Sequence, residues 1–278
     1  MIKIFIFCVF YAQVAGKFYP ANRDELLKMI KILGEGIKKE VKGEIFGLIC
    51  PHAGYIFSGR TASFAFKQLE GLENKTFIII GLKHGFSTYP IAVMKSEKFI
   101  TPLGEAHIDK NLSQKIANFS DKIFYTDEPF YYEHSAEVEI PFIQYYTKNP
   151  KFVLILMREQ SFDLCKKLAD AISNAIKGRD DVIIVASSDF YHGYDYNMCK
   201  EITKEAADAI LSLEPSSFYE LFVKKHCACA GGAITTLLLL AKKEGADKIK
   251  LMHITNSGDV TGRKEGYVVG YASFVITK

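Results

Sequence analysis

Three histidines in this 278-residue chain each follow an apolar run of the length of a buried strand. They are His52 after residues 45–50, His84 after residues 77–81, and His192 after residues 182–186. Neutral imidazoles are common metal ligands, so His52 and His84 can share one ion if their strands are neighbours. Alternatively, each histidine only caps the end of its strand through hydrogen bonds. The recurrence at three strand ends lowers the weight of that alternative without removing it.

Two cysteines supply a softer ligand for the same site. Cys227 and Cys229 lie just before Gly231 and an apolar helical segment. A thiolate near a helix N-terminus is stabilised by the helix dipole, whose effect fades beyond the first turn, so we predict the closer Cys229 as the ligand. If this segment is extended, both thiols point to the same face, so the alternation of side chains along a strand does not decide between them. The competing interpretation is that these cysteines are small hydrophobic residues of the core.

Carboxylates accompany the histidines. Asp189 and His192 follow one strand three residues apart, where the carboxylate can orient a histidine or accept a proton. Equally, the segment 187–189 can be a simple turn. A second polar group, Glu133 to Glu137 with His134, either lines a pocket or forms an exposed loop, and composition does not separate the two.

The composition excludes several functional classes. With 35 Lys and Arg against 32 Asp and Glu, the net charge of +3 argues against a nucleic-acid partner. The chain has no C-x-x-C pair, G-x-S-x-G, Walker loop or G-x-G-x-x-G, so nucleotide binding is not supported. Six scattered cysteines do not resemble a disulfide framework, which favours a reducing compartment such as the cytoplasm.

Strand-like and helix-like segments alternate along the chain and must position these residues. Buried strands are predicted at 45–50, 77–80, 152–157 and 182–186, and helices after a cap at Asn22 and at 60–69, 161–177, 197–213, 215–225 and 231–243. Two closing strands, 250–255 and 267–276, bracket a turn at 258–262. We therefore predict a single α/β domain over residues 14–278, with a mostly parallel or mixed sheet flanked by helices. Ligands bind at the carboxyl ends of such strands.

The first 13 residues form an apolar extension. A run from Ile2 to Phe10 contains one lysine and is too short to span a membrane. It is either a buried first strand, an extended start of the gene, or a short export signal. Phe10, at the position where a cleavage site needs a small residue, argues against export, so we expect a cytoplasmic protein with export as the alternative.

Several motifs together resemble the Memo family from residue 14 onward. They are AGKFYP at 15–20, PHAGY at 51–55, TPLG at 101–104, EHS at 133–135, SSDF at 187–190, and SGDVTG at 257–262. The resemblance implies a fold similar to class III extradiol dioxygenases, which use non-haem iron. It departs at Ala230, where the family commonly has glycine, and at Leu82 and Lys83, where proline and serine are more usual.

The resemblance also implies a site and partners. The metal ligands fall on His52, His84 and Cys229, with Asp189 and His192 close by, and we expect these two to be the catalytic acid and base. We expect Tyr55, His134 and Glu137 to bind substrate. In prokaryotes the family is associated with a radical SAM protein and a third small partner, the AmmeMemoRadiSam trio. The expected function is an iron- or copper-dependent redox protein of unknown substrate, and the alternative is a non-catalytic module that grips a peptide or partner in the same pocket.

Overall fold

Four parallel strands with continuous apolar sequences form the centre of the molecule. The computed structural model describes residues 8–278. Its central strands lie in the order β8 (Lys151–Met157), β3 (Thr76–Leu82), β9 (Val182–Ser187) and β2 (Ile45–Cys50). All neighbours in this group pair in parallel. Their carboxyl ends therefore meet at one edge of the sheet, as predicted.

The condition that the strands before His52 and His84 be direct neighbours is not met. The two strands are parallel, but β9 lies between them and pairs with both. A parallel connection needs a crossover, and a crossover can leave room for a strand that comes much later in the chain. His52 and His84 consequently lie on either side of the carboxyl end of β9, and their own strands are not direct neighbours.

Shorter strands extend this core on both sides and make the sheet mixed. Beyond β2 lie β12 (Val268–Thr277), which is antiparallel to it, and then β11 (Lys248–Asn256) and β10 (His192–Gly193), which both pair with β12. Beyond β8 lie β6 (Gly104–Ile108), β5 (Lys98–Thr101) and β1 (Val9–Tyr11), while β4 (Ile91–Val93) joins β7 (Ile123–Tyr125) to β8. The predicted α/β class with a mixed sheet in one domain is confirmed.

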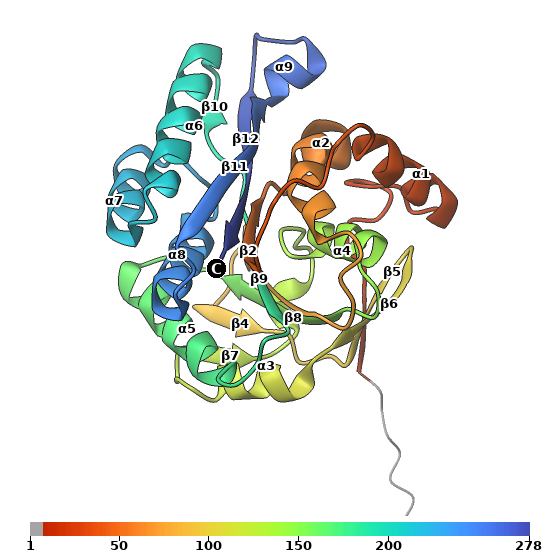
Figure 1. Cartoon of the computed structure of the whole chain (residues 1–278), viewed down its shortest axis with the longest axis vertical. Helices are drawn as coiled ribbons and strands as arrows, with labels where there is room; N and C mark the ends of the chain where they lie inside the picture. The colour runs from red at the N-terminus through yellow and green to blue at the C-terminus, as the bar shows by residue number, and fades with distance from the viewer. Residues whose placement is uncertain (1–7) are drawn as a thin grey trace, which may run out of the picture.

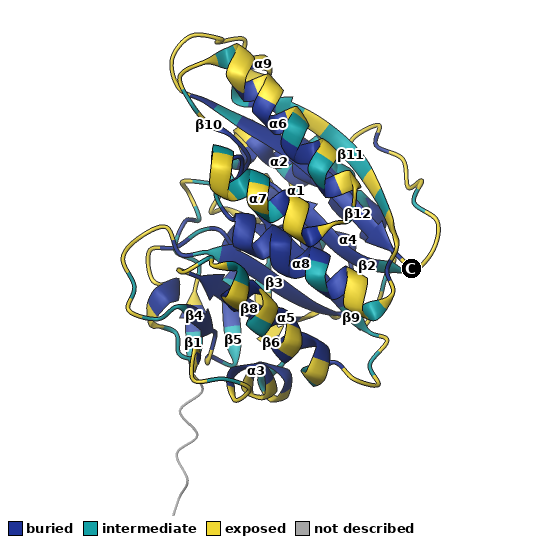
Figure 2. Ribbon diagram, turned by 90° about the vertical axis from the view of Figure 1, so that its left-hand side faces the viewer, coloured by how far each residue is buried: buried dark blue, intermediate teal, exposed yellow. Residues whose placement is uncertain are grey.

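Helices cover both faces of the sheet, which explains why the central strands are apolar throughout rather than alternating (Figures 1 and 2). One face packs against α1 (Arg23–Leu33), α2 (Tyr55–Phe66) and α4 (Ile140–Tyr146). The other packs against α3 (Lys110–Ala117), α5 (Phe162–Ala175), α6 (Tyr196–Leu211), α7 (Pro215–Lys225) and α8 (Gly231–Glu244). Side chains of β3 alternate between the two faces. Phe77 and Ile79 pack on the face covered by α1, α2 and α4, and Ile78 and Ile80 pack on the opposite face.

Helix boundaries differ from the prediction at two places. Helix α2 begins at Tyr55, five residues earlier than expected, because the chain turns directly after Gly54 into the helix. The expected turn at 258–262 is instead a short helix, α9 (Ser257–Thr261), which Asn256 caps and Gly262 ends at φ 74°. Helix α3 and strand β7 have no counterpart among the predicted elements.

The end of the N-terminal extension belongs to the sheet. Residues 9–11 form β1, and Phe10 is buried against Phe99, Phe130 and Tyr131. Residues 1–7, on which the export hypothesis depends, lie outside the described residues. Across residues 8–278, no helix has both the length and the apolar character needed to cross a membrane.

Candidate metal centre

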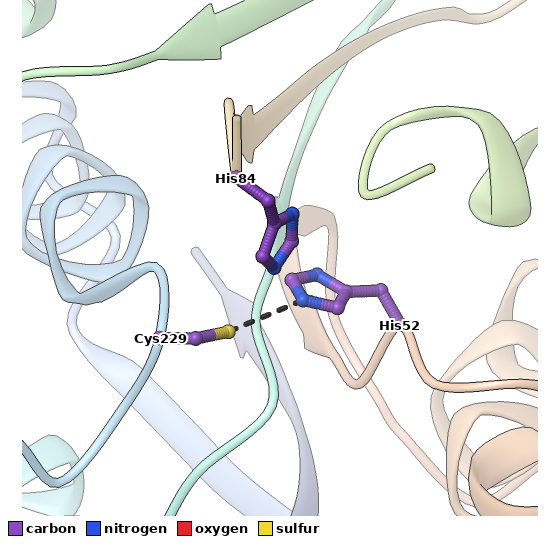
Figure 3. A group of neighbouring side chains, drawn as sticks. All are labelled: His52, His84 and Cys229. Atoms are coloured by element: carbon purple, nitrogen blue, oxygen red, sulfur yellow. Dashed lines mark hydrogen bonds between the residues drawn. The ribbon is translucent and has the colours of Figure 1, made fainter. Parts of the chain in front are cut away.

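Two imidazoles and one thiol meet at the carboxyl edge of the central strands (Figure 3). His52 follows β2, His84 follows β3, and Cys229 lies in the turn before α8. One ligand atom from each residue lies within 4.8 Å of the other two. The Nε2 atom of His52 is 3.2 Å from the Sγ atom of Cys229. Three segments separated by up to 177 positions are thus brought to one point.

His52 is held from behind by Ser187, the last residue of β9, and by Asp189, two residues later. The Oδ1 atom of Asp189 accepts hydrogen bonds from the main-chain N–H groups of His52, at 2.8 Å, and Ala53, at 3.2 Å. The Nδ1 atom of His52 lies 3.0 Å from the hydroxyl of Ser187. These contacts fix the backbone and the ring of His52, and they leave its Nε2 atom directed at Cys229.

Glu133 holds His84 in the same way. Its Oε2 atom accepts from the main-chain N–H of His84 at 2.6 Å, and its Oε1 atom lies 2.9 Å from the Nδ1 atom of His84. The N–H groups of His134 and Ser135 also donate to Oε1. Burial alone would raise the pKa of Glu133, but the hydrogen bond from His84 and the other donors outweigh it and bring the pKa well below its usual range. An ionised Glu133 therefore orients His84 and leaves Nε2 free.

The structure separates the two candidate thiols. Cys227 is buried among the helices of the core, whereas Cys229 faces His52. The condition under which both thiols would share a face, an extended segment, is not met, because Cys229 sits in a turn. The N–H of Cys229 donates to the carbonyl of Asp189 at 3.0 Å, and the side-chain amide of Gln160 donates to the carbonyl of Cys229 at 3.0 Å.

The thiol is not acidic in the protein alone, contrary to the expected effect of the helix dipole. Burial, together with the nearby carboxylate of Asp189, raises the pKa of Cys229 to about 12. Burial also lowers the pKa of His52 well below its usual value, with further contributions from His134 and His84. Loss of water at this depth outweighs the dipole. A bound cation reverses the balance, because it stabilises the thiolate and binds neutral imidazole. This donor set therefore fits a metal ion.

His134 completes the wall of the site. Its ring stacks on His84 with centroids 4.4 Å apart and stands edge-on to His52 at 5.3 Å. Burial lowers the pKa of His134 to about 4. His84, Glu133 and His134 also form a compact donor group, but the oxygens of Glu133 already accept four N–H groups. We therefore interpret the group of His84, Glu133 and His134 as a support for His84 and not as a second metal site.

The two residues expected to act as acid and base occupy different environments. Asp189 is buried, and burial raises its pKa to about 7, although the two N–H groups that it accepts oppose the shift. His192 is exposed, and its Nδ1 atom lies 2.7 Å from the carbonyl of Phe190. Asp189 therefore contacts the His52 loop, and the hydrogen bond expected to orient His192 comes from the main chain instead.

Tyr55 and Glu137 form hydrogen bonds to other parts of the protein, and neither belongs to the donor group of His52, His84 and Cys229. The buried hydroxyl of Tyr55 donates to the carbonyl of Val138 at 2.7 Å. Glu137 accepts from the N–H groups of Gln13 and Val14 and from the hydroxyl of Tyr19, at 2.7 to 2.9 Å. Glu137 thus anchors the segment after β1, a contact between residues more than 115 positions apart that sequence reasoning had no signal to find.

Comparison with known proteins shows which family this chain belongs to. The model that describes Memo-like proteins matches residues 11–275. The chain belongs to the Memo family. A MEMO1 family protein from Thermoplasma acidophilum is 37% identical over 264 residues, which cover 94% of this chain and 96% of the relative. A MEMO1 family protein from Nitrosopumilus maritimus is 34% identical over 267 residues, which cover 94% of this chain and 96% of the relative. One from Archaeoglobus fulgidus is 35% identical over 271 residues, which cover 95% of this chain and 98% of the relative.

Among solved structures, an uncharacterised protein from Escherichia coli K12 aligns with 81% of this Memo family chain and 99% of its own, with a TM-score of 0.43 and 13% identity. That likeness is too remote to carry an argument.

Proposed function

We propose that this Memo family protein binds one iron or copper ion through His52, His84 and Cys229 and carries out redox chemistry with it. One observation carries the proposal: three donor atoms lie within 4.8 Å of one another, while protein groups hold the far side of both imidazoles. Two imidazoles and a thiolate suit iron, copper or zinc and do not suit magnesium or calcium. Iron and copper change oxidation state, whereas zinc does not.

A metal of this kind supplies electron transfer and a binding place for a substrate atom. The surrounding residues would then divide the remaining work. His84 and His192 are both exposed imidazoles at this edge of the sheet; because His84 is assigned to the metal, we assign proton transfer to His192. Asp189 keeps the His52 loop in place, and its raised pKa also makes it a proton acceptor near neutral pH. His134 lines the substrate side, while Tyr55 and Glu137 support the fold around it.

The test is metal content after anaerobic purification with added Fe(II) or Cu(I), measured by mass spectrometry. We expect about one ion per chain in the wild type and a trace in His52→Ala. His107→Ala is a matched control, because His107 is a largely exposed histidine on β6 whose ion-pair neighbour is Glu105. Equal, trace metal in all three proteins would overturn the site. Retention of zinc alone, with no iron or copper, would overturn the redox assignment.

A non-catalytic binding role has separate support at the rim. Lys83, which directly precedes His84 in the chain, and Phe86, with Tyr131 and Tyr132, border a hollow of about 400 Å³. Phe86 is 84% exposed and Tyr132 is 92% exposed, and exposed aromatic side chains are typical of binding surfaces. The candidate partners are the radical SAM protein and the third component of the trio. Binding of either, lost in Tyr132→Ala and accompanied by no oxygen consumption with catechols or reductants, would favour this role.

The two roles differ in what His192→Ala should do. If the protein is a redox enzyme, this variant abolishes oxygen consumption and keeps its metal. If the protein only binds a partner, neither the wild type nor this variant consumes oxygen, and partner binding is the property to compare. The cysteines are free thiols, which fits the reducing, cytoplasmic location that we propose.

A further inference from the structure

A fully buried carboxyl group lies directly behind His52. Glu139 is 0% exposed and precedes helix α4. Its Oε1 atom lies 2.6 Å from the hydroxyl oxygen of Ser187, the same hydroxyl that contacts the Nδ1 atom of His52. Its Oε2 atom has no hydrogen-bond partner among the described residues. Within residues 8–278, only one of the two oxygen atoms of this buried carboxyl group has a hydrogen-bond partner. The protonation state of Glu139 must explain how the second oxygen is tolerated there.

Hydrogen counting at the Ser187 hydroxyl indicates that protonation state. Three polar atoms surround the oxygen: the carbonyl of Ser135 at 2.5 Å, Oε1 of Glu139 at 2.6 Å, and Nδ1 of His52 at 3.0 Å. A hydroxyl has one proton to donate and two lone pairs that accept. A carbonyl can only accept, so the single proton points to Ser135. The other two neighbours must then both donate to Ser187.

We propose that Glu139 is a neutral carboxylic acid that donates its proton to Ser187, and that this contact fixes His52 as the tautomer protonated on Nδ1. In that tautomer the lone pair of Nε2 faces Cys229, ready for a metal ion. Glu139 is thus a positioning residue that acts through Ser187. The statement about the metal rests on the function proposed above, whereas the protonation pattern does not.

The surroundings of Glu139 agree with a neutral acid. An ionised carboxylate would leave Oε2 charged, buried and without a donor, which is among the costliest arrangements in a protein interior. Burial raises the pKa of Glu139 well above its usual value, the negative charge of Asp189 raises it further, and the contact with Ser187 only partly opposes this. The competing arrangement turns the Ser187 proton toward an ionised Glu139. It would leave two oxygen atoms 2.5 Å apart, those of Ser187 and the Ser135 carbonyl, with no proton between them.

Infrared spectroscopy of the metal-free protein at neutral pH tests the protonation of Glu139. We expect a carbonyl band of a protonated carboxylic acid that disappears in Glu139→Gln. Asp181→Asn is the control, because Arg179 pairs with Asp181 and keeps that carboxylate ionised, so no such band should be lost. Absence of a band specific to Glu139 in the wild type would overturn the proposal.

Nitrogen NMR of metal-free protein with labelled histidine tests the tautomer. The wild type and Glu139→Gln, whose amide can still donate, should both show His52 protonated on Nδ1. Glu139→Met, which has similar length and no donor, should show mixed tautomers and bind Fe(II) about tenfold more weakly. A wild-type His52 protonated on Nε2 would refute the inference. The expected band and tautomer in a wild type that binds no metal would instead refute the proposed function alone.

Discussion

Replacing Glu133 with glutamine should weaken metal binding and destabilise the fold by separable amounts. The four N–H groups around Glu133 all need acceptors, and three of them share Oε1. A glutamine has one oxygen and one NH₂ group. If its oxygen takes the place of Oε1, the NH₂ group faces the main-chain N–H of His84. If the amide is reversed, the NH₂ group faces the other three donors.

At least one buried N–H therefore loses its acceptor, which costs about 1–3 kcal/mol of unfolding free energy. Loss of the carboxylate that orients a ligand histidine typically lowers metal affinity by about 10- to 100-fold. That range corresponds to about 1.4–2.7 kcal/mol of binding free energy. The two effects need two assays: urea unfolding for stability, and competition with a chromophoric chelator for metal affinity.

Glu137→Gln is the matched control. Glu137 is also buried and accepts from two main-chain N–H groups and one hydroxyl, but within residues 8–278 it has no hydrogen bond to a histidine. It should lose a similar free energy of unfolding and keep the wild-type metal affinity. Unchanged affinity in folded Glu133→Gln would refute the assigned role. Equal losses of affinity in both variants would show that the effect comes from general destabilisation.

Three further predictions concern other parts of the molecule. Cys229→Ser should lower metal affinity at least tenfold, while Cys227→Ser should leave it unchanged and cost about 1–3 kcal/mol of stability by burying a hydroxyl in the core; chelator competition and urea unfolding distinguish the two. Gly81→Ala should destabilise by about 1–3 kcal/mol in urea, because its Cβ atom would lie 2.5 Å from a serine hydroxyl oxygen. Arg179→Met should be less stable than wild type at pH 7. The hydrogen bond from Arg179 lowers the pKa of Asp181, so the stabilisation is present above the unfolded value of about 4 and is lost as the pH falls through the lower folded value.

These three predictions fail in different ways. Equal affinity losses in the two cysteine variants would indicate a shared thiol site. An alanine at position 81 that leaves the urea midpoint unchanged would mean that the neighbouring loop yields freely. A stability difference for Arg179→Met that persists at the acid end of the titration would mean that the ion pair is not its source.

Local sequence patterns were sufficient to predict most of the secondary structure. The apolar runs that became β2, β3, β8 and β9 needed cover on both faces, and the helices on either side provide it. Asn22 caps α1 as predicted, since its side chain accepts from the N–H groups of Asp24 and Glu25. The histidines at the strand ends followed from the same pattern, because parallel strands present their carboxyl ends at one edge.

Tertiary structure alone decided which groups meet there. The placement of β9 between β2 and β3, and the pairing of Glu133 with His84 across 49 positions, depend on non-local contacts that leave no periodic signal in the chain. The sequence pointed to Cys229 through the helix dipole, whereas the structural reason that Cys229 and not Cys227 faces His52 is a turn. The pKa of that thiol follows from burial, which is a property of the assembled fold. Residue types and spacing therefore determine which donors are available, and packing determines which of them share a site and in what charge state.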